Sequence, residues 1–185
     1  MKSLVLAFSG SIGSGKSTLS LSVAKALNWP YVSFGNHVRT VALLRGLGES
    51  REILQEVGES LIQEGWEQFC KSVLAQTTWE PGEPLVVDGI RHVEVVETLQ
   101  LLSVPCELLL IYIKLNEPTR KARLYKRSPD DYAQMQSIEY HSTEVQVKRQ
   151  LPQIANLIVS GERSTDDIIR EILIWIQNYI ARYQD

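Results

Sequence analysis

The chain has 185 residues, of which 44% are hydrophobic and 22% charged, and its formal net charge is −3. These values are typical of one globular domain with a sizeable core. They argue against a general attraction to nucleic acid or anionic membranes, and no apolar stretch is long enough to cross a bilayer. Cys70 and Cys106 lack metal-ligand spacing, so we expect two buried thiols in a cytoplasmic protein.

The first predicted element is the apolar strand Leu4 to Phe8, followed by a glycine-rich loop and a helix from Thr18 to Leu27. The loop has the spacing G-x-x-x-x-G-K-S, whose glycines let backbone N–H groups surround a phosphate at a helix start. We predict that ATP binds here, with Lys16 on the β- and γ-phosphates and Ser17 on Mg²⁺. The predicted nucleotide-binding residues are Gly10, Ser11, Ile12, Gly13, Ser14, Gly15, Lys16, Ser17 and Thr18.

The next elements are a short strand from Tyr31 to Phe34 and a helix from about His37 to Leu47, opened by Gly35-Asn36. Residues 49–78 have apolar side chains at helical spacing and predict one long helical stretch, kinked at Gly58 or Gly65. No acidic residue precedes Glu49, so the N-terminal quarter is cationic, as expected of an anion-binding region.

The remaining elements alternate between apolar strands and helices. The predicted strands are Leu85 to Asp88, Leu108 to Ile113 and Asn156 to Val159. The predicted helices are 93–102, about 117–127, about 137–150 and a final helix capped by Ser164 with Asp167, and Ser128 to Asp131 form a break. Such alternation predicts an α/β fold with a parallel sheet of about five strands and helices on both faces.

Ligands of such sheets bind beyond the carboxyl ends of the strands, where several charged residues are expected to converge. Asp88 ends a strand and can orient a water bound to Mg²⁺ near Ser17, although a capping aspartate is the alternative. Arg39 and Arg91 also follow strand ends, and their guanidinium groups suit a second anionic substrate. Surface ion pairs are the alternative for both arginines.

Arg120, Arg123 and Arg127 share one face of a predicted helix that leads into the Pro/Asp break. A solvated basic face is one interpretation. In the other, the helix belongs to a lid that brings Arg123 and Arg127 onto the transferred phosphoryl group, so that they act as catalytic residues with Lys16 and Asp88.

The segments GSIGSGKST, FGNHVR, VVDGIRHVEVVETL and RKARLYKRSPDD occur in an order that resembles the nucleoside monophosphate kinase group of P-loop proteins. FGNHVR is similar to the T-G-D-x-x-R segment of adenylate kinases and DGIR to their D-G-F/Y-P-R. The resemblance implies that Gly35, Arg39 and Arg91 bind the acceptor. Asn36 replaces the usual Asp, the DGIR loop lacks Pro, and the zinc-bearing lid is absent.

This resemblance implies a P-loop NTPase three-layer sandwich formed by a single domain over residues 1–185. It also implies a helical acceptor-binding insertion at about 35–80 and a short lid at about 120–135. The chain is similar to an uncharacterised archaeal adenylate-kinase-like family as well, and less closely to dephospho-CoA kinases.

The expected reaction is ATP-dependent phosphoryl transfer to a small phosphorylated acceptor, most simply a nucleoside or deoxynucleoside monophosphate, by a monomer or homodimer. A phosphate acceptor is already ionised, and the segment from Asn28 to Gly48 contains no carboxylate that would serve as a base. An alcohol acceptor such as dephospho-CoA or a nucleoside, with Asp88 as the base, is one alternative. A regulatory nucleotide-binding module is the other, and a kinase of nucleic-acid ends is disfavoured by the net charge.

Overall fold

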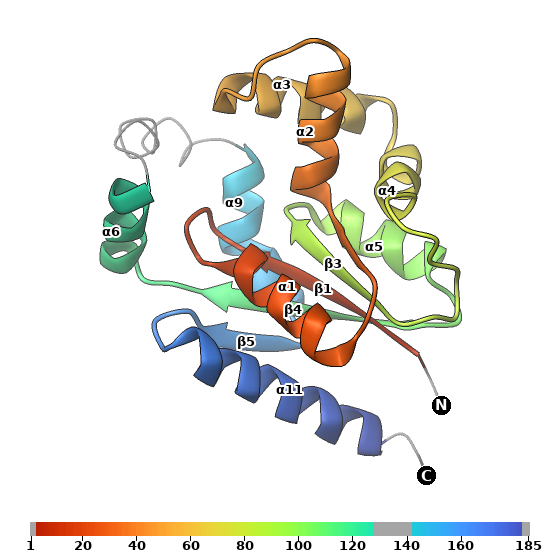
Figure 1. Cartoon of the computed structure of the whole chain (residues 1–185), viewed down its shortest axis with the longest axis vertical. Helices are drawn as coiled ribbons and strands as arrows, with labels where there is room; N and C mark the ends of the chain where they lie inside the picture. Colours follow the sequence, from red (N-terminus) through yellow and green to blue (C-terminus); the bar gives the residue numbers. More distant parts are fainter. Residues whose placement is uncertain (1–2, 128–141, 183–185) are drawn as a thin grey trace.

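The computed structural model of the chain describes residues 3–127 and 142–182 (Figure 1). Within these residues, five parallel strands form one sheet in the order β2-β3-β1-β4-β5. Their bounds are β1 (Leu4–Gly10), β2 (Tyr31–Ser33), β3 (Leu85–Ile90), β4 (Glu107–Lys114) and β5 (Leu157–Ser160). The predicted α/β fold with a parallel sheet between helical layers, that of the P-loop NTPases, is confirmed.

Helices cover both faces of the sheet, as Figure 1 shows. The described helices are α1 (Lys16–Leu27), α2 (Phe34–Leu44), α3 (Arg51–Gln63), α4 (Trp66–Leu74), α5 (Val93–Leu102), α6 (Glu117–Arg127), α9 (Ser142–Arg149), α10 (Leu151–Ile154) and α11 (Thr165–Arg182). Helices α1 and α11 lie on one face, and α4, α5 and α9 on the other. Helices α2 and α3 rise beyond the carboxyl end of β3, at the top of the view.

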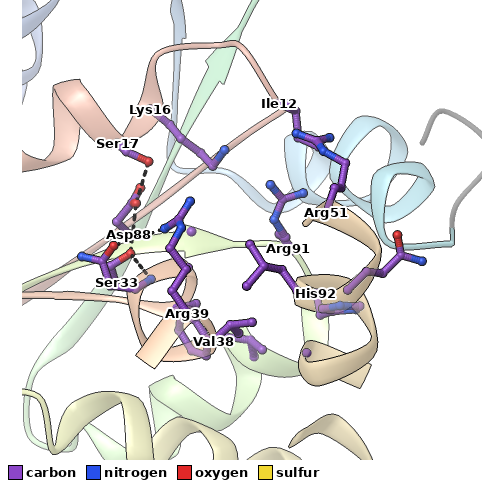
Figure 2. A pocket seen from close by; sticks show the side chains of 18 of the residues that line it. Ile12, Lys16, Ser17, Ser33, Val38, Arg39, Arg51, Asp88, Arg91 and His92 are labelled. Carbon is purple, nitrogen blue, oxygen red and sulfur yellow. Dashed lines mark hydrogen bonds between the residues drawn. The ribbon is translucent and has the colours of Figure 1, made fainter. Parts of the chain in front are cut away.

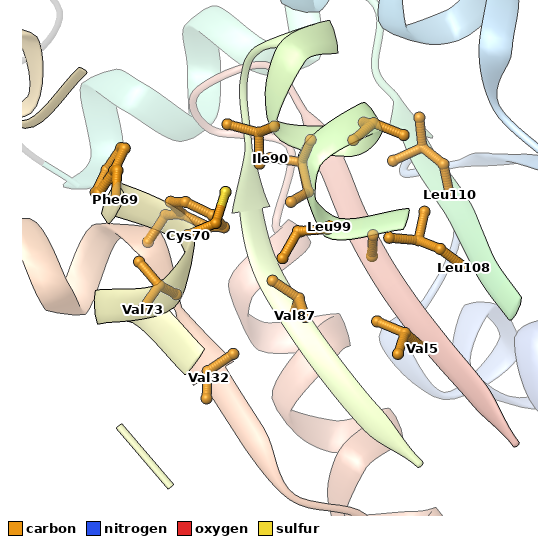
Figure 3. Close-up of a cluster of buried hydrophobic side chains, with 14 of the residues drawn as sticks. Val5, Val32, Phe69, Cys70, Val73, Val87, Ile90, Leu99, Leu108 and Leu110 are labelled. Carbon is orange, nitrogen blue, oxygen red and sulfur yellow. The ribbon is translucent and has the colours of Figure 1, made fainter. Parts of the chain in front are cut away.

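The central strand β1 is buried along its whole length because each face contacts a different helical layer. Val5 and Ala7 belong to the cluster that includes α4 and α5, part of which Figure 3 shows. Leu6 and Phe8 point the other way, into the cluster with α1 and α11. This two-sided burial explains the unbroken apolar run that predicted the strand.

The long predicted stretch from residue 49 to 78 is two helices, α3 and α4. The break comes at Gly65, whose φ of 115° lies outside helical conformations, whereas Gly58 continues α3 without a kink. Helix α2 begins at Phe34, earlier than predicted, because the Ser33 hydroxyl accepts a hydrogen bond from the backbone N–H of Asn36 at 3.3 Å. The early start places Gly35 and Asn36 inside the first turn.

Other boundaries differ by a few residues. Gly89 and Ile90 belong to β3 rather than to a loop, and the short helix α10 precedes β5. Ser164 caps α11 as predicted, because its hydroxyl accepts from the N–H of Asp167 at 3.2 Å. The predicted break at 128–131 and the predicted start of the next helix at 137 lie outside the described residues.

Both cysteines are buried free thiols, in agreement with the sequence-based expectation. Burial raises the pKa of Cys70 to about 12 and raises the pKa of Cys106 as well. Across residues 3–127 and 142–182, the helices include none with the length and apolarity that a membrane span requires.

Candidate functional site

A cavity of about 760 Å³ opens beyond the carboxyl ends of β1, β2 and β3, a size typical of small-molecule sites. The glycine-rich loop of residues 10–17, called the phosphate loop below, contributes to its wall together with α2, α3, α6 and the residues after β3. The predicted site residues that line it are Ile12, Gly13, Gly15, Lys16, Ser17, Thr18, Gly35, Arg39, Asp88, Arg91 and Arg123. Gly10, Ser11 and Ser14 are predicted site residues that do not line the cavity. The structure does not describe the side chain of Arg127.

The phosphate loop needs its glycines for two physical reasons. Gly13 and Gly15 have φ values of 84° and 85°, which disfavour any side chain. At Gly10, an added Cβ would lie 2.7 Å from the carbonyl oxygen of Ile113. Gly15 is the N-cap of α1 and has no side chain that could accept hydrogen bonds from the first N–H groups of the helix. The start of α1 lines the cavity, so these N–H groups are available to an anion there.

Asp88 of β3 links Ser17, at the end of the phosphate loop, to Ser33 of the neighbouring strand β2 (Figure 2). Its Oδ2 accepts hydrogen bonds from Ser17 Oγ at 2.8 Å and from Ser33 Oγ at 3.4 Å. The residue is 3% exposed, and its Oδ1 is buried with no hydrogen-bond partner among the described residues. A buried carboxylate oxygen of this kind is costly unless something binds it, and a water on Mg²⁺ is a suitable donor.

The protein supplies only part of a metal site at this position. Within the described parts of the chain, no group of three or more His, Cys, Asp or Glu side chains is arranged to hold a metal. Mg²⁺ keeps several waters and usually binds one or two protein groups together with substrate phosphates. Ser17 and Asp88 therefore fit a magnesium ion that arrives with a nucleotide.

Tyr31 lies beside this carboxylate and also lines the cavity. Burial and the negative charge of Asp88 raise the pKa of the Tyr31 phenol. The phenol therefore stays protonated at neutral pH and keeps its O–H as a donor next to the Ser17–Asp88 pair.

Three arginines from three different elements point into the same part of the cavity in Figure 2. Arg39 comes from α2, Arg91 follows β3, and Arg51 is the first residue of α3. Arg39 Nη1 donates to Asn36 Oδ1 at 3.3 Å, so the residue that replaces the usual Asp holds this guanidinium without neutralising it. Sequence reasoning found Arg39 and Arg91 and missed Arg51, which does not follow a strand.

The arginines of α6 do not share one exposed face. Arg120 is 1% exposed and bonds Glu117 Oε2 at 2.8 Å, which removes it from the predicted basic surface. Arg123 lies against the phosphate loop: its Nη2 donates to the Gly161 carbonyl at 2.8 Å and its Nη1 to the Ser14 carbonyl at 3.4 Å. Arg123 therefore borders the cavity on the side of the phosphate loop, and its predicted role toward phosphate stays a prediction.

Away from these charges, the cavity has an apolar wall formed by α2, α3, α4 and α5. The apolar side chains in it are Val38, Leu54, Ile62, Phe69 and Val95. Glu49, Gln55 and Glu59 also line the cavity, so carboxylates are present near this wall although none precedes Glu49 in the sequence. The cavity thus combines a cationic region beside the phosphate loop with a partly apolar region beside α3.

Comparison with known sequences gives two kinds of match. The profile of a family described as "AAA domain" matches residues 6–145. A UPF0200 protein of Pyrobaculum aerophilum is 34% identical over 131 residues, which are 69% of this chain and 68% of that protein. A UPF0200 protein of Aeropyrum pernix is 35% identical over 96 residues, which are 52% of this chain and about half (51%) of the relative.

Several solved structures with the same fold are named as small-molecule kinases. The APS kinase of Mycobacterium tuberculosis, solved with AMPPNP and APS, aligns at a TM-score of 0.63 with 18% identity over 95% of this chain and 98% of that one. Shikimate kinases and a gluconokinase align at TM-scores between 0.55 and 0.61. These likenesses, with 14–18% sequence identity, show a shared fold.

Proposed function

We propose that this chain, which belongs to the AAA domain family and to the UPF0200 proteins, transfers the γ-phosphoryl group of ATP to a small phosphorylated acceptor. A nucleoside or deoxynucleoside monophosphate is the proposed acceptor. The observation that carries the proposal is the convergence of two cationic groups on one cavity. Lys16 and the phosphate loop form one side, and Arg39, Arg51 and Arg91 reach it from the other.

On the donor side, the phosphate loop holds the triphosphate of ATP. Lys16 neutralises charge on the β- and γ-phosphates, and Ser17 and Asp88 are the residues that would hold a magnesium ion. When bound, that ion would neutralise charge on the phosphates. Arg123 completes the positive surroundings of the transferred group from α6, and Arg127 is proposed to act in the same lid.

On the acceptor side, arginine side chains hold the acceptor phosphate so that one of its oxygens faces the γ-phosphorus. A guanidinium group binds two phosphate oxygens at once, which fixes orientation as well as charge. The attacking oxygen of a phosphate is already ionised, so the reaction requires positioning and charge neutralisation but no general base. Helices α2 to α4, within the proposed acceptor region 35–80, supply most of this surface.

The position of Asp88 favours a phosphate over an alcohol acceptor. An alcohol has to lose a proton to a nearby base, whereas Asp88 accepts from Ser17 and Ser33 on Oδ2 and its Oδ1 is assigned in this proposal to a water on the magnesium ion. Proteins with this fold nevertheless include kinases named for shikimate and for gluconate. Acceptors of both chemical classes therefore belong in the test.

The test measures ADP formation from ATP and Mg²⁺, with and without each candidate acceptor. The panel contains the common ribo- and deoxynucleoside monophosphates, together with shikimate, gluconate and a nucleoside. Stimulation by a monophosphate supports the proposal, provided that Lys16→Ala abolishes it. Lys25→Ala, which removes the same charge from an exposed position of α1, should keep full activity.

Two other outcomes would replace the proposal. Stimulation by an alcohol alone would assign Asp88 to proton removal. ATP binding without stimulation by any acceptor would favour a regulatory nucleotide-binding module.

A further inference from the structure

Helix α3 contains a glycine at a position where the described structure does not require one. Gly58 lies in the middle of α3, far from both helix ends, and has an ordinary helical conformation. A Cβ added to it would meet no atom of the described residues within 4 Å outside the backbone of its own helix, so neither their packing nor backbone strain excludes a side chain. Glycine at such a position makes the helix less stable than alanine would.

The empty space beside Gly58 is part of the cavity. Arg51, Leu54, Gly58 and Ile62 recur at helical spacing on the face of α3 that lines it. Arg51 stands two turns from Gly58, at the start of α3, and lines the cavity together with Ile12 of the phosphate loop. The exposed helix backbone at Gly58 therefore lies between the proposed phosphate-binding end and the apolar end of one surface.

We propose that Gly58 determines acceptor specificity by leaving room for a flat heterocyclic ring to lie against α3. This inference rests on the proposed function and adds which part of the cavity receives the base of the acceptor and which residue makes room for it. Leu54 and Ile62 flank the space on the same helix and contact the apolar face of the ring that lies against α3. Gln55 and Glu59 line the cavity on the same helix and accept hydrogen bonds from N–H groups at the ring edge.

A compact polyol acceptor would fit this surface poorly. Its hydroxyl groups would face Leu54, Ile62 and Phe69 without partners, which costs free energy on binding. A planar base buries its faces against the apolar side chains and keeps its polar atoms at the edge. The space at Gly58 thus favours a nucleotide over a sugar acid.

The experiment compares Gly58→Ala and Gly58→Leu with the wild-type protein. Both replacements favour helix, so the melting temperature of the free protein should rise, by about 2–4 °C for Gly58→Ala. The KM for the monophosphate should rise with side-chain size, roughly tenfold or more for Gly58→Leu, because the new atoms occupy the ring position. The KM for ATP should stay unchanged.

Glu56→Ala is the matched control, because Glu56 is exposed on the same helix and does not line the cavity. It should change neither KM. Binding of each nucleoside monophosphate, measured by calorimetry on all four proteins, provides a readout that does not depend on turnover.

Each result decides between distinct conclusions. A higher melting temperature together with weaker monophosphate binding supports the role of Gly58. A lower melting temperature would mean that the fold itself needs the glycine, and equal monophosphate affinity in all variants would overturn the inference while leaving the proposed function intact. Absence of monophosphate binding to the wild-type protein would end both.

Discussion

Replacing Asp88 by Asn removes one negative charge and keeps the shape of the side chain. The amide oxygen can still accept from Ser17 Oγ, which now lies 2.8 Å from Asp88 Oδ2. What is lost is the negative charge that Oδ1 would offer to a water on Mg²⁺, at a place almost fully shielded from solvent, since Asp88 is 3% exposed. Hydrogen bonds to a charged group contribute about 1.5–3 kcal/mol, equivalent to roughly 10- to 150-fold in rate.

The fold itself should not suffer from this substitution. Asp88 Oδ1 is buried without a hydrogen-bond partner among the described residues, so the free protein gains nothing from the charge there. We therefore expect an unchanged or higher melting temperature for Asp88→Asn. Loss of activity with retained stability would separate a role in phosphoryl transfer from a role in folding.

The assay is a titration of Mg²⁺ at saturating ATP and acceptor. Asp88→Asn should lower kcat by the factor given above and raise the Mg²⁺ concentration needed for half of the maximal rate. Asp167→Asn, at the exposed start of α11, is a control that removes the same charge far from the cavity. A variant with lower kcat but an unaltered Mg²⁺ requirement would refute the assignment of Asp88 to the metal.

Three further predictions concern other parts of the structure. Arg51→Ala should raise the acceptor KM at least tenfold with little change in the ATP KM. Arg45→Ala removes an exposed charge outside the cavity and should change neither KM. Equal effects of the two substitutions would contradict a role for Arg51. Gly10→Ala should lower the melting temperature and weaken ATP binding, because its Cβ would lie 2.7 Å from a backbone oxygen; binding as tight as in the wild-type protein would show that the loop adapts. Cys70 should resist alkylation at pH 8 in the native protein and react in urea. Burial raises the pKa of this thiol to about 12, so on the order of one molecule in ten thousand is ionised at that pH. Rapid labelling of the native protein, measured by mass spectrometry, would contradict this prediction.

Residues that follow strands were predictable because the rule that locates them is topological. Once the apolar runs defined parallel strands, the phosphate loop, Asp88 and Arg91 had to meet at one edge of the sheet. Side chains brought in by inserted helices obey no such rule. Arg51 begins α3 after a connecting loop, and its approach to the phosphate loop depends on how α2 and α3 pack, which helical periodicity does not reveal.

The α6 helix shows a second limit of sequence reasoning. The spacing of Arg120 and Arg123 predicted a shared face, yet Arg120 is buried against Glu117 and Arg123 reaches backbone carbonyls of two loops. An arginine is buried only where a partner carboxylate and the surrounding packing compensate its desolvation. Glu117 was visible in the sequence, but the packing around it was not.

Helices α2, α3 and α4 all lie between two strands that are hydrogen-bonded neighbours, with Ser33 of β2 beside Asp88 of β3. The chain therefore leaves the sheet and rejoins it within one pair of adjacent strands. The length and composition of the segment between β2 and β3 can change while the two strands keep their register. The Ser17–Asp88 contact is then kept as well. Such an arrangement permits exchange of one inserted helical module for another on a constant sheet and phosphate loop.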